Sequence, residues 1–472
     1  MDNNSKNISR REFFKKFGLG VAATSVIASA CSDNAKQTDG GEDIPKGKMT
    51  YRENPKTKEK VSLLGYGMMR LPIVQSENSK NAGSARDTDA PIDQEAVNRL
   101  VDYAIEHGVN YFDTSPAYCK GKSEHSTGIA LSRHKRNEYF IATKLSNFAP
   151  QTWSYEASVE MFNNSLKELQ VDYIDYLLLH GVGMGEDGMQ ALHQRYLDNG
   201  VLDFLLQQRE KGIIRNLGFS YHGDIKVFDY LLSQHGKYHW DFVQIQMNYV
   251  DWQYAKEINA RNTNAEYLYN QLAALDIPVV VMEPLLGGRL VKMADPLVKQ
   301  MKQREPEMSM ASWAFRFLGS YPKVLTSLSG MTEMQHLKDN LRTHCPLKPL
   351  TEQDKEFLFS IAKQMMELNN IPCNECQYCM PCPYGLDIPA IFTHYNKCIN
   401  EGNISQSVND SNYKKARKAF LVGYDRSVPK LRQANMCTGC NECSPHCPQR
   451  IAIPTEMQKI DAYTEKLKRN IL

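Results

Sequence analysis

From residue 93 onward, short apolar segments alternate with longer segments whose apolar residues recur at helical spacing. The short segments are nearly continuous runs of apolar residues, which is typical of strands buried on both faces of a parallel sheet. Strands of this kind that alternate with amphipathic helices predict a parallel α/β architecture. The expected strands are 111–114, 139–145, 173–180, 214–220, 242–248, 278–282 and 324–329, and the expected helices are 94–107, 124–132, 155–169, 202–211, 225–234, 264–275 and 309–318.

The number of strands favours a closed barrel. Together with a first strand ahead of residue 93 there are eight, so we expect a (β/α)8 TIM barrel, an α/β fold. The alternative is an open, doubly wound sheet, which would favour an early glycine-rich phosphate loop that the sequence lacks. A barrel takes roughly 250 residues, so a chain of 472 residues has room for a second, smaller domain.

Three consecutive expected strands end in a polar, ionisable residue. The segment YFDTSPAY ends its strand at Asp113 and places Tyr118 five residues later, FIATK ends at Lys144, and YIDYLLLH ends at His180. The carboxyl ends of parallel barrel strands point to one face, so these side chains are expected to converge there. A lone tyrosine or histidine at a strand end is more often structural, but four complementary residues at successive strand ends favour a catalytic site.

The four residue types suit proton transfer. A free phenol has a pKa of about 10 and donates its proton poorly near neutral pH. A nearby ammonium group favours the phenolate and lowers that pKa, and a carboxylate beside the lysine keeps the ammonium charged and oriented. Catalytic acids work best when their pKa lies near the operating pH.

This arrangement resembles the catalytic tetrad of the aldo-keto reductases. The motifs FDTSPAY, TKL and LLLH carry the match, and the resemblance covers residues 49–345. It implies that Tyr118 is the general acid, that Lys144 and Asp113 tune it, and that His180 positions the carbonyl of a small carbonyl or alcohol substrate. It also implies a short hairpin ahead of the first barrel strand.

The same resemblance implies NAD(P) extended across the strand ends in the later half of the barrel. Two positions depart from the family: Met282 stands where an aromatic residue often stacks on the nicotinamide, and no Arg or Lys directly follows Gly330 to hold a 2′-phosphate. The choice between NAD and NADP is therefore left open. The expected dinucleotide contacts are Ser220, Gln246, Leu285, Gly287, Gly330, Met331, His336, Asp339 and Asn340.

Eight of the twelve cysteines form two tight runs near the C-terminus. The second run, CTGCNECSPHCP, follows the bacterial ferredoxin spacing, and the first, CNECQYCMPCP, has two residues instead of three before its last cysteine. The runs predict two [4Fe-4S] clusters, with two structural zinc sites as the alternative. In two-cluster ferredoxins the fourth cysteine of each run ligates the other cluster. The expected ligands are Cys373, Cys376, Cys379 and Cys447 for one cluster, and Cys437, Cys440, Cys443 and Cys382 for the other.

More than fifty residues with helical patterns separate the two runs, which resembles the α-helical ferredoxin type. The whole chain thus resembles the branch of aldo-keto reductases with a C-terminal ferredoxin-type domain. Of the remaining cysteines, Cys345 and Cys398 are expected to be buried thiols, and Cys119 either touches substrate or packs. Helices are expected at 349–370, 388–400 and 413–422, and the segment 181–200 is expected to be a loop beside the substrate.

The N-terminus resembles a twin-arginine export signal. Arg10 and Arg11 precede an apolar run that is too short to span a bilayer as a mature helix, and Cys31 follows small residues. Two outcomes are left open, a lipid anchor on Cys31 or cleavage after Ala30, and the alternative to a signal is a basic amphipathic helix. Such signals deliver folded proteins to the periplasm, which suits a protein that receives its clusters first.

The expected organisation is a signal peptide at 1–31, a disordered tether at 32–48, the barrel at 49–345, a connecting helix at 346–372 and the ferredoxin-type domain at 373–472. A net charge of +2 with 42% hydrophobic residues is ordinary globular composition and points to no nucleic-acid partner. The expected function is an exported NAD(P)-linked oxidoreductase with iron-sulfur electron transfer and a redox protein partner. The alternative is an electron-transfer or partner-docking subunit whose barrel is not an active reductase.

Overall fold

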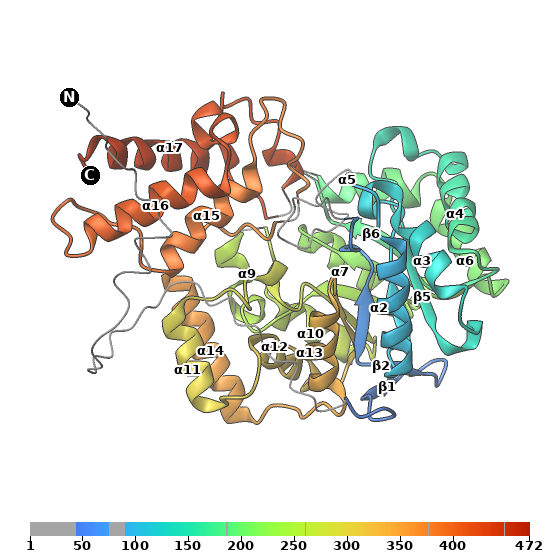
Figure 1. Ribbon diagram of the computed structural model, residues 1–472. Coiled ribbons are helices and arrows are strands. Elements are labelled where there is room, and N and C mark those ends of the chain that lie inside the picture. The colour runs from blue at the N-terminus through green and yellow to red at the C-terminus, as the bar shows by residue number, and fades with distance from the viewer. Residues whose placement is uncertain (1–43, 75–89, 186, 260, 376, 448) are drawn as a thin grey trace, which may run out of the picture. The chain divides into compact units, whose positions relative to one another are not determined.

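The computed structural model describes residues 44–74, 90–185, 187–259, 261–375, 377–447 and 449–472 (Figure 1). The export signal and most of the tether lie outside these residues. Two cysteines with expected roles, Cys31 and Cys376, also lie outside them. The predictions that concern these segments are therefore not addressed by the fold.

Eight parallel strands close into a barrel, which confirms the expected (β/α)8 fold. Each strand pairs with its successor, and β10 pairs in parallel with β3 to close the ring. An antiparallel hairpin of β1 (Tyr51–Glu53) and β2 (Lys60–Ser62) precedes the barrel. The barrel strands are β3 (Leu64–Gly67), β4 (Tyr111–Asp113), β5 (Phe140–Leu145), β6 (Ile174–Val182), β7 (Ile214–Tyr221), β8 (Phe242–Gln246), β9 (Val279–Met282) and β10 (Val324–Ser329).

The helices that follow the strands agree closely with the amphipathic pattern. Ser154 caps α4 by accepting a hydrogen bond from the Ala157 backbone N–H, and Gln170 ends that helix in the left-handed conformation. The outer helices are α2 (Gln94–Glu106), α3 (Ser123–Leu131), α4 (Tyr155–Leu169), α6 (Val201–Glu210), α7 (Ile225–Ser233), α10 (Ala265–Ala274), α12 (Met310–Gly319) and α13 (Met334–His344).

The structure corrects the expected boundaries in two loops. Strand β8 ends at Gln246 rather than at residue 248. The Asn248 side chain accepts hydrogen bonds from the backbone N–H groups of Val250 and Asp251, just ahead of α9 (Asp251–Ile258). The segment expected to be a loop at 181–200 contains α5 (Gly188–Leu192) and a π-helical turn (His193–Leu197). Further helices that periodicity did not reveal are α8 (His235–Tyr238) and α11 (Asp295–Arg304).

The barrel interior is a packed core. Tyr176 lies at its centre, with ring centroids 5.0 Å from Tyr111 and 5.1 Å from Phe242. Val61 of the hairpin is fully buried in the same cluster, so the hairpin contributes an apolar side chain to this core. Burying these side chains leaves the opposite, carboxyl end of the strands as the place for polar chemistry.

The C-terminal segment is helical, as the pattern predicted. Helix α14 (Glu352–Glu367) begins with a capping box at Thr351 and packs on the barrel, where Trp313 and Phe357 lie 5.7 Å apart. Helices α15 (Ile388–Asn400), α16 (Tyr413–Ser427) and α17 (Ile453–Arg469) share a separate apolar cluster. The first cysteine run lies between α14 and α15, and the second between α16 and α17. None of the helices in the described part of the chain has the length and apolar content of a membrane span.

Candidate active site

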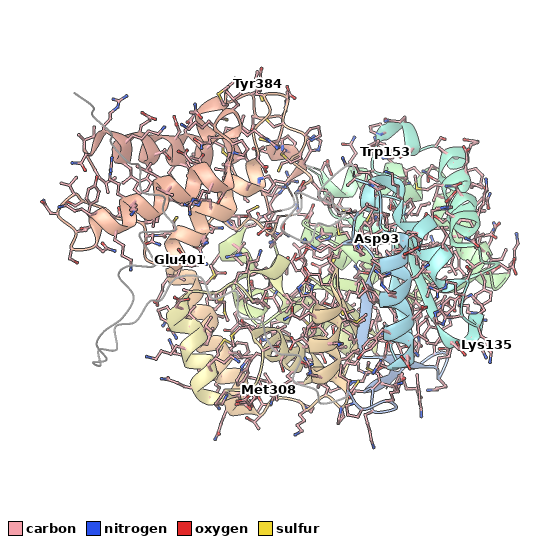
Figure 2. All side chains as sticks on the ribbon, viewed as in Figure 1. Asp93, Lys135, Trp153, Met308, Tyr384 and Glu401 are labelled. Carbon is pink, nitrogen blue, oxygen red and sulfur yellow. The ribbon has the colours of Figure 1, made fainter. Side chains whose placement is uncertain are left out.

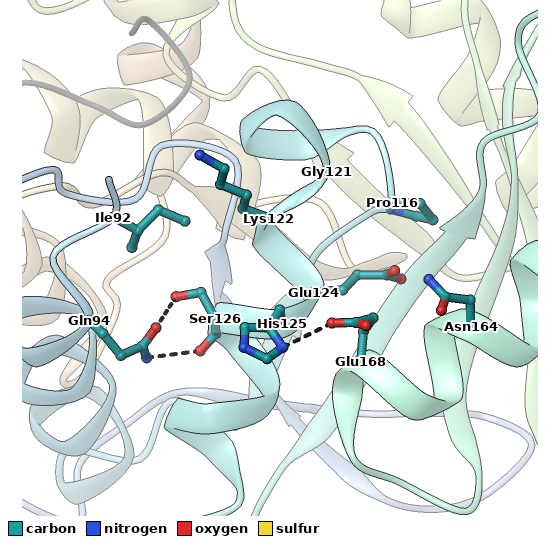
Figure 3. A pocket seen from close by; sticks show the side chains of 10 residues that line it. All are labelled: Ile92, Gln94, Pro116, Gly121, Lys122, Glu124, His125, Ser126, Asn164 and Glu168. Carbon is teal, nitrogen blue, oxygen red and sulfur yellow. Dashed lines mark hydrogen bonds and ion pairs between the residues drawn. The ribbon is translucent and has the colours of Figure 1, made fainter. Parts of the chain in front are cut away.

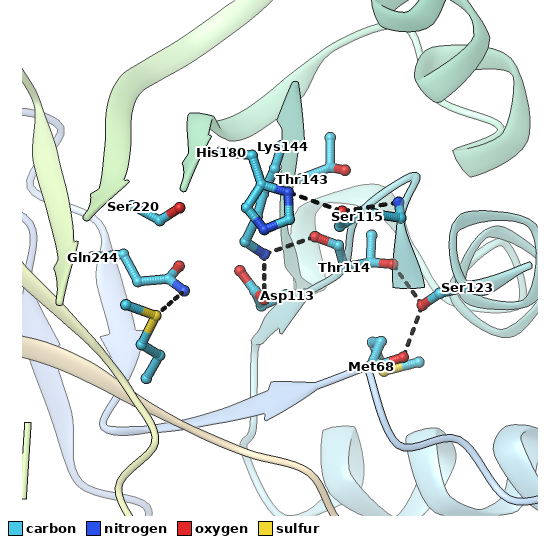
Figure 4. A network of polar contacts seen from close by, with 12 residues as sticks. Met68, Asp113, Thr114, Ser115, Ser123, Thr143, Lys144, His180, Ser220 and Gln244 are labelled. Carbon is cyan, nitrogen blue, oxygen red and sulfur yellow. Dashed lines mark hydrogen bonds and ion pairs between the residues drawn. The ribbon is translucent and has the colours of Figure 1, made fainter. Parts of the chain in front are cut away.

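The four residues at the strand ends meet in one buried site. Figure 4 shows three of them, Asp113, Lys144 and His180. Lys144 Nζ lies 2.6 Å from Asp113 Oδ1 and 2.8 Å from the Thr114 carbonyl oxygen. The same ammonium lies 4.7 Å from the centre of the Tyr118 ring, and the Tyr118 and His180 rings are 5.9 Å apart at 81°. The predicted convergence of the tetrad is present in the structure.

A strained turn presents the tyrosine. Tyr118 opens a short 3₁₀ turn whose next two residues, Cys119 and Lys120, both have positive φ angles of 50° and 54°. The Cys119 side chain is buried, and its Sγ contacts the backbone oxygens of Met68 and Met69 at 3.8 and 3.4 Å. Of the two expectations for Cys119, the structure supports packing.

Burial sets the electrostatics of the lysine–aspartate pair. Loss of solvation raises the pKa of Asp113 and lowers the pKa of Lys144, and the attraction between the two groups opposes both shifts. Because the ammonium lies beside the Tyr118 ring, its charge favours the phenolate form of the tyrosine. The arrangement therefore helps the phenol to release its proton.

His180 is held as a neutral imidazole. Burial lowers its pKa well below the usual range, and the positive charges of Lys144 and Arg195 act in the same direction. Its Nδ1 lies 2.6 Å from Ser146 Oγ and 3.3 Å from Ser115 Oγ, and its backbone carbonyl accepts a hydrogen bond from Arg195. If Nδ1 accepts from the Ser146 hydroxyl, the Nε2–H remains available to donate to a substrate oxygen.

The positions expected to contact the dinucleotide lie in varied surroundings. Ser220 is buried and its Oγ accepts from the Gly181 backbone N–H at 2.8 Å, and Gln246 Nε2 donates to Asp251 Oδ2 at 2.7 Å. Leu285 and Gly287 belong to the turn after β9, where Gly287 has a φ of 66°. The last five positions lie at or near α13, with Met331 and Asn340 buried, Asp339 half-buried, Gly330 exposed beside Met331, and His336 exposed.

A cation that the local sequence did not reveal lies beside Gly330. A Cβ atom at this glycine would lie 3.2 to 3.4 Å from the side-chain carbons of Arg70, which follows β3. The hydroxyl of Thr332 also donates to the Arg70 carbonyl oxygen at 2.8 Å. Arg70 and Gly330 are thus neighbours in space although 260 residues separate them in the sequence.

A hollow of about 630 Å³ lies outside the tetrad, between α3 and α4 (Figure 3). Glu124 lines it, is itself buried, and accepts hydrogen bonds from Thr143 Oγ1 and Ser165 Oγ. Burial raises the pKa of Glu124 to about 7. None of the predicted catalytic residues lines this hollow.

None of the cysteines in the described part of the chain forms a disulfide bond. Cys382 of the first run and Cys437 of the second both lie close enough to Cys443 for their charges to act on it. Glu375 N–H points to Cys373 Sγ at 3.4 Å. Cys345 and Cys398 are buried, as expected. No group of three metal-ligating side chains is assembled among the described residues, which leave out Cys376.

Comparison with known proteins identifies the barrel. Residues 64–356 match the Aldo/keto reductase family. The uncharacterized oxidoreductase YqkF of Bacillus subtilis is 26% identical over 293 residues, which cover 56% of this chain and 87% of that protein. D-arabinose 1-dehydrogenase of Saccharomyces cerevisiae is 33% identical over 129 residues, covering 26% of this chain and 35% of that protein. A solved thermostable aldo-keto reductase in complex with the inhibitor epalrestat covers 66% of this chain and all of its own, with 21% identity and a TM-score of 0.52, which shows the fold.

Proposed function

The chain belongs to the aldo/keto reductase family of oxidoreductases, and we propose that its barrel interconverts a small carbonyl compound and its alcohol with NAD(P). The observation that carries this proposal is the contact of 2.6 Å between Lys144 and Asp113 beside the Tyr118 ring. D-arabinose 1-dehydrogenase, one of the relatives, is named for a small sugar substrate, which supports the substrate class. When bound, the nicotinamide supplies or accepts the hydride.

The protein's own residues handle the proton. In the reductive direction Tyr118 gives its hydroxyl proton to the substrate oxygen, while the Lys144 ammonium stabilises the phenolate that remains. His180, neutral and fixed through Nδ1, donates from Nε2 to the same substrate oxygen and so orients the carbonyl. In the oxidative direction the phenolate takes the proton back from the alcohol.

The surroundings of the tetrad fit a ligand with N–H or O–H groups. Asp113 Oδ2 and Gln244 Oε1 are buried acceptor atoms without a hydrogen-bond partner among the described residues. Figure 4 shows Gln244 and Ser220 beside the Asp113–Lys144 pair. A nicotinamide carboxamide carries the donor hydrogens that such acceptors need.

The C-terminal segment is proposed to hold two [4Fe-4S] clusters. Each cluster would be ligated by the first three cysteines of one run and the last cysteine of the other run. The closeness of Cys382 to Cys443 supports the crossing, because it joins the last cysteine of the first run to the second run. Residues between the cysteines, including Glu375, Gln377 and Asn441, have positive φ angles, as tight cysteine loops require. Such clusters carry one electron each and would serve a redox protein partner.

Iron analysis of the full chain, purified without oxygen, tests the cluster proposal. We expect about eight iron atoms per chain, and about half of them to be lost in Cys382→Ser. Cys398→Ser is the matched control, because Cys398 is a buried thiol outside both runs. Zinc in place of iron, or equal metal content in Cys382→Ser and Cys398→Ser, would contradict the proposal.

Export by the twin-arginine route is proposed from the sequence of the N-terminus. Replacement of both Arg10 and Arg11 by lysine should retain the protein in the cytoplasmic fraction. Mass spectrometry of the mature N-terminus distinguishes a lipid on Cys31 from cleavage after Ala30. An unprocessed chain that stays in the cytoplasm in both forms would contradict export.

Anaerobic assays of Tyr118→Phe test the reductase function. Dinucleotide released from the denatured wild-type protein is identified, and carbonyl reduction is then followed with NADH and NADPH. We expect Tyr118→Phe to lower kcat by about a hundredfold to ten-thousandfold, the usual contribution of a general acid. Unchanged turnover and unchanged bleaching of the iron-sulfur absorbance in this variant would favour the alternative, an electron-transfer subunit with an inactive barrel.

A further inference from the structure

The cysteine-bearing segment, residues 373–472, contacts the barrel at the start of its first cysteine run. A Cβ atom at Gly287 would lie 2.4 Å from Asn374 Cβ, so the segment packs against the loop that follows β9. Asn374 Nδ2 also donates to Glu283 Oε1 at 3.5 Å. Because Asn374 directly follows Cys373, this expected cluster ligand lies next to the barrel.

The second cysteine run also contacts the barrel, close to its last cysteine. Arg450, three residues after Cys447, donates from Nη2 to the Gly185 carbonyl oxygen at 2.7 Å, in the loop that follows β6. Cys447 itself is buried. Since Cys373 and Cys447 are expected to ligate the same cluster, that cluster would lie on the side of the segment that faces the barrel.

The expected ligands of the other cluster are more open to solvent. Cys440 is exposed, and Cys382, Cys437 and Cys443 are partly exposed. The cluster on these four cysteines would therefore be the one that a second protein can approach from solvent.

Two stretches of chain beside these open cysteines are hydrogen-bonded to each other. The Asp387 backbone N–H donates to the Arg432 carbonyl oxygen at 3.1 Å, and Arg432 Nε donates to the Gly385 carbonyl oxygen at 3.2 Å. Tyr384 directly precedes Gly385, and Leu431 directly precedes Arg432. The backbone positions of Tyr384 and Leu431 are therefore held close together, just beyond the first cysteine run.

These stretches expose three large apolar side chains, which we call the apolar patch. Leu431 is 78% exposed, Tyr384 49% and Met436 38%, and Figure 2 shows Tyr384 at the surface of the C-terminal segment. The Met436 N–H donates to the Gln433 carbonyl oxygen at 3.1 Å, and Met436 directly precedes Cys437. Apolar side chains that gather at a protein surface, rather than standing singly, mark interaction sites. The patch thus has the character of a protein-binding surface beside the open cysteines.

The charge of the cysteine-bearing segment indicates the kind of protein that fits. The segment has 13 Lys and Arg against 9 Asp and Glu, a net charge of +4, whereas the whole chain has +2. Lys430 and Arg432 flank Leu431 directly; Lys430 is exposed, and Arg432 pairs with Asp387 at 3.5 Å. Such a surface attracts an acidic partner and repels a basic one, a second copy of this segment included.

We propose that the apolar patch is the docking surface for a small acidic protein that carries single electrons. This inference rests on the proposed iron-sulfur function of the segment. The patch supplies apolar contact, and the basic residues around Leu431 steer the acidic partner towards it. The partner would then lie over Cys440 and its neighbours, on cysteines that the barrel leaves open.

Binding of two carrier proteins of opposite charge to the full chain, purified without oxygen, tests the inference. The first is flavodoxin, a small acidic carrier of single electrons, and the second is cytochrome c, a basic one. We expect flavodoxin to bind with a micromolar Kd that weakens as salt is added, and cytochrome c not to bind. Absence of flavodoxin binding, or equal binding of both carriers, would overturn the inference.

Single variants locate the surface. Leu431→Ser should raise the Kd for flavodoxin about fivefold to twentyfold, because an apolar contact is lost. Lys430→Glu should raise it about threefold to tenfold at low ionic strength and less at high ionic strength. The matched controls are Leu275→Ser, at an exposed leucine after α10, and Lys135→Glu, at an exposed lysine that Figure 2 labels on the barrel. Equal Kd values in each variant and its control would overturn the inference.

Two further measurements separate the possible outcomes. Binding of the wild type to phosphatidylglycerol vesicles, or its self-association, that is lost in Leu431→Ser while flavodoxin binding is unchanged would assign the patch to a membrane or a second copy and overturn the inference. Iron content is measured in the same preparations. A wild type without iron would contradict the cluster proposal, and the flavodoxin comparison would still decide the role of the patch.

Discussion

Ser146 Oγ lies 2.6 Å from Nδ1 of His180, which is the shorter of the two serine contacts to this ring nitrogen. A neutral imidazole has one donor and one acceptor nitrogen, so a hydroxyl that donates to Nδ1 places the proton on Nε2. The serine comes from the end of β5, directly beyond Lys144 and Leu145. Side chains from two neighbouring strands, β5 and β6, therefore meet at this imidazole.

Replacing Ser146 with alanine should lower kcat about twofold to tenfold, since one hydrogen bond that orients the donor is lost. Ser146→Thr keeps the hydroxyl and should restore most of the activity. Ser115→Ala is the comparison, because Ser115 Oγ lies farther from Nδ1, at 3.3 Å. Steady-state kinetics would contradict this role if Ser146→Ala raised only KM or left both constants unchanged.

Removing one partner of the buried ion pair should be costly. Asp113→Asn leaves the Lys144 ammonium buried without its carboxylate, and we expect the free energy of unfolding to fall by about 3 to 5 kcal/mol. The double variant Asp113→Asn with Lys144→Met removes both charges and should recover part of that loss. Urea unfolding of the three proteins measures the effect, and a double variant less stable than the single one would argue against it.

The stability of the protein should depend on the ionisation of Glu124. Its pKa is raised to about 7 by burial, so between about pH 4.5 and 7 the folded protein keeps a proton that the unfolded chain has lost. The contribution of Glu124 to the free energy of unfolding therefore falls by about 3 kcal/mol as the pH rises from about 4.5 to 7, and it stays low above pH 7.

Glu124→Gln keeps the shape of the side chain and removes the titration. Unfolding free energies measured at pH 5 and pH 8 should differ less in this variant than in the wild type, with the gain in stability appearing at pH 8. The exposed residue Glu95 offers a control, since Glu95→Gln should leave the pH dependence unchanged. An equal pH dependence in wild type and Glu124→Gln would refute the assignment.

Alanine variants of two adjacent glycines separate the effect of a lost contact with the cysteine-bearing segment from the effect of backbone strain. Gly287 and Gly288 both have positive φ angles, but only a Cβ atom at Gly287 would strike Asn374. Both alanine variants carry the conformational cost, about 1 kcal/mol or more, while Gly287→Ala should also loosen the cysteine-bearing segment from the barrel. Limited proteolysis between α14 and α15 should therefore speed up in Gly287→Ala and much less in Gly288→Ala; equal rates would contradict the contact.

Local patterns in the sequence were sufficient for the barrel and its tetrad. Strands and helices differ in the spacing of their apolar residues, so both can be predicted from the sequence. Parallel barrel strands end on one face, so Asp113, Lys144 and His180 could be placed together from the sequence alone. The cysteine spacing predicts two [4Fe-4S] clusters, and this stays a prediction. The predicted end of β8 was wrong at Asn248, where a single side chain hydrogen-bonds the backbone. Such a bond depends on one residue, so the spacing of apolar residues does not reveal it.

Only the tertiary structure decided which distant segments meet. Arg70 lies beside Gly330 and Asn374 lies against Gly287, yet neither pair is close in the sequence. Such contacts depend on how the loops pack against the barrel, and the spacing of apolar residues along the chain does not reveal that packing. The sequence thus determined the fold and the candidate catalytic residues, whereas the packing of the cysteine-bearing loops on the strand ends determined what surrounds them.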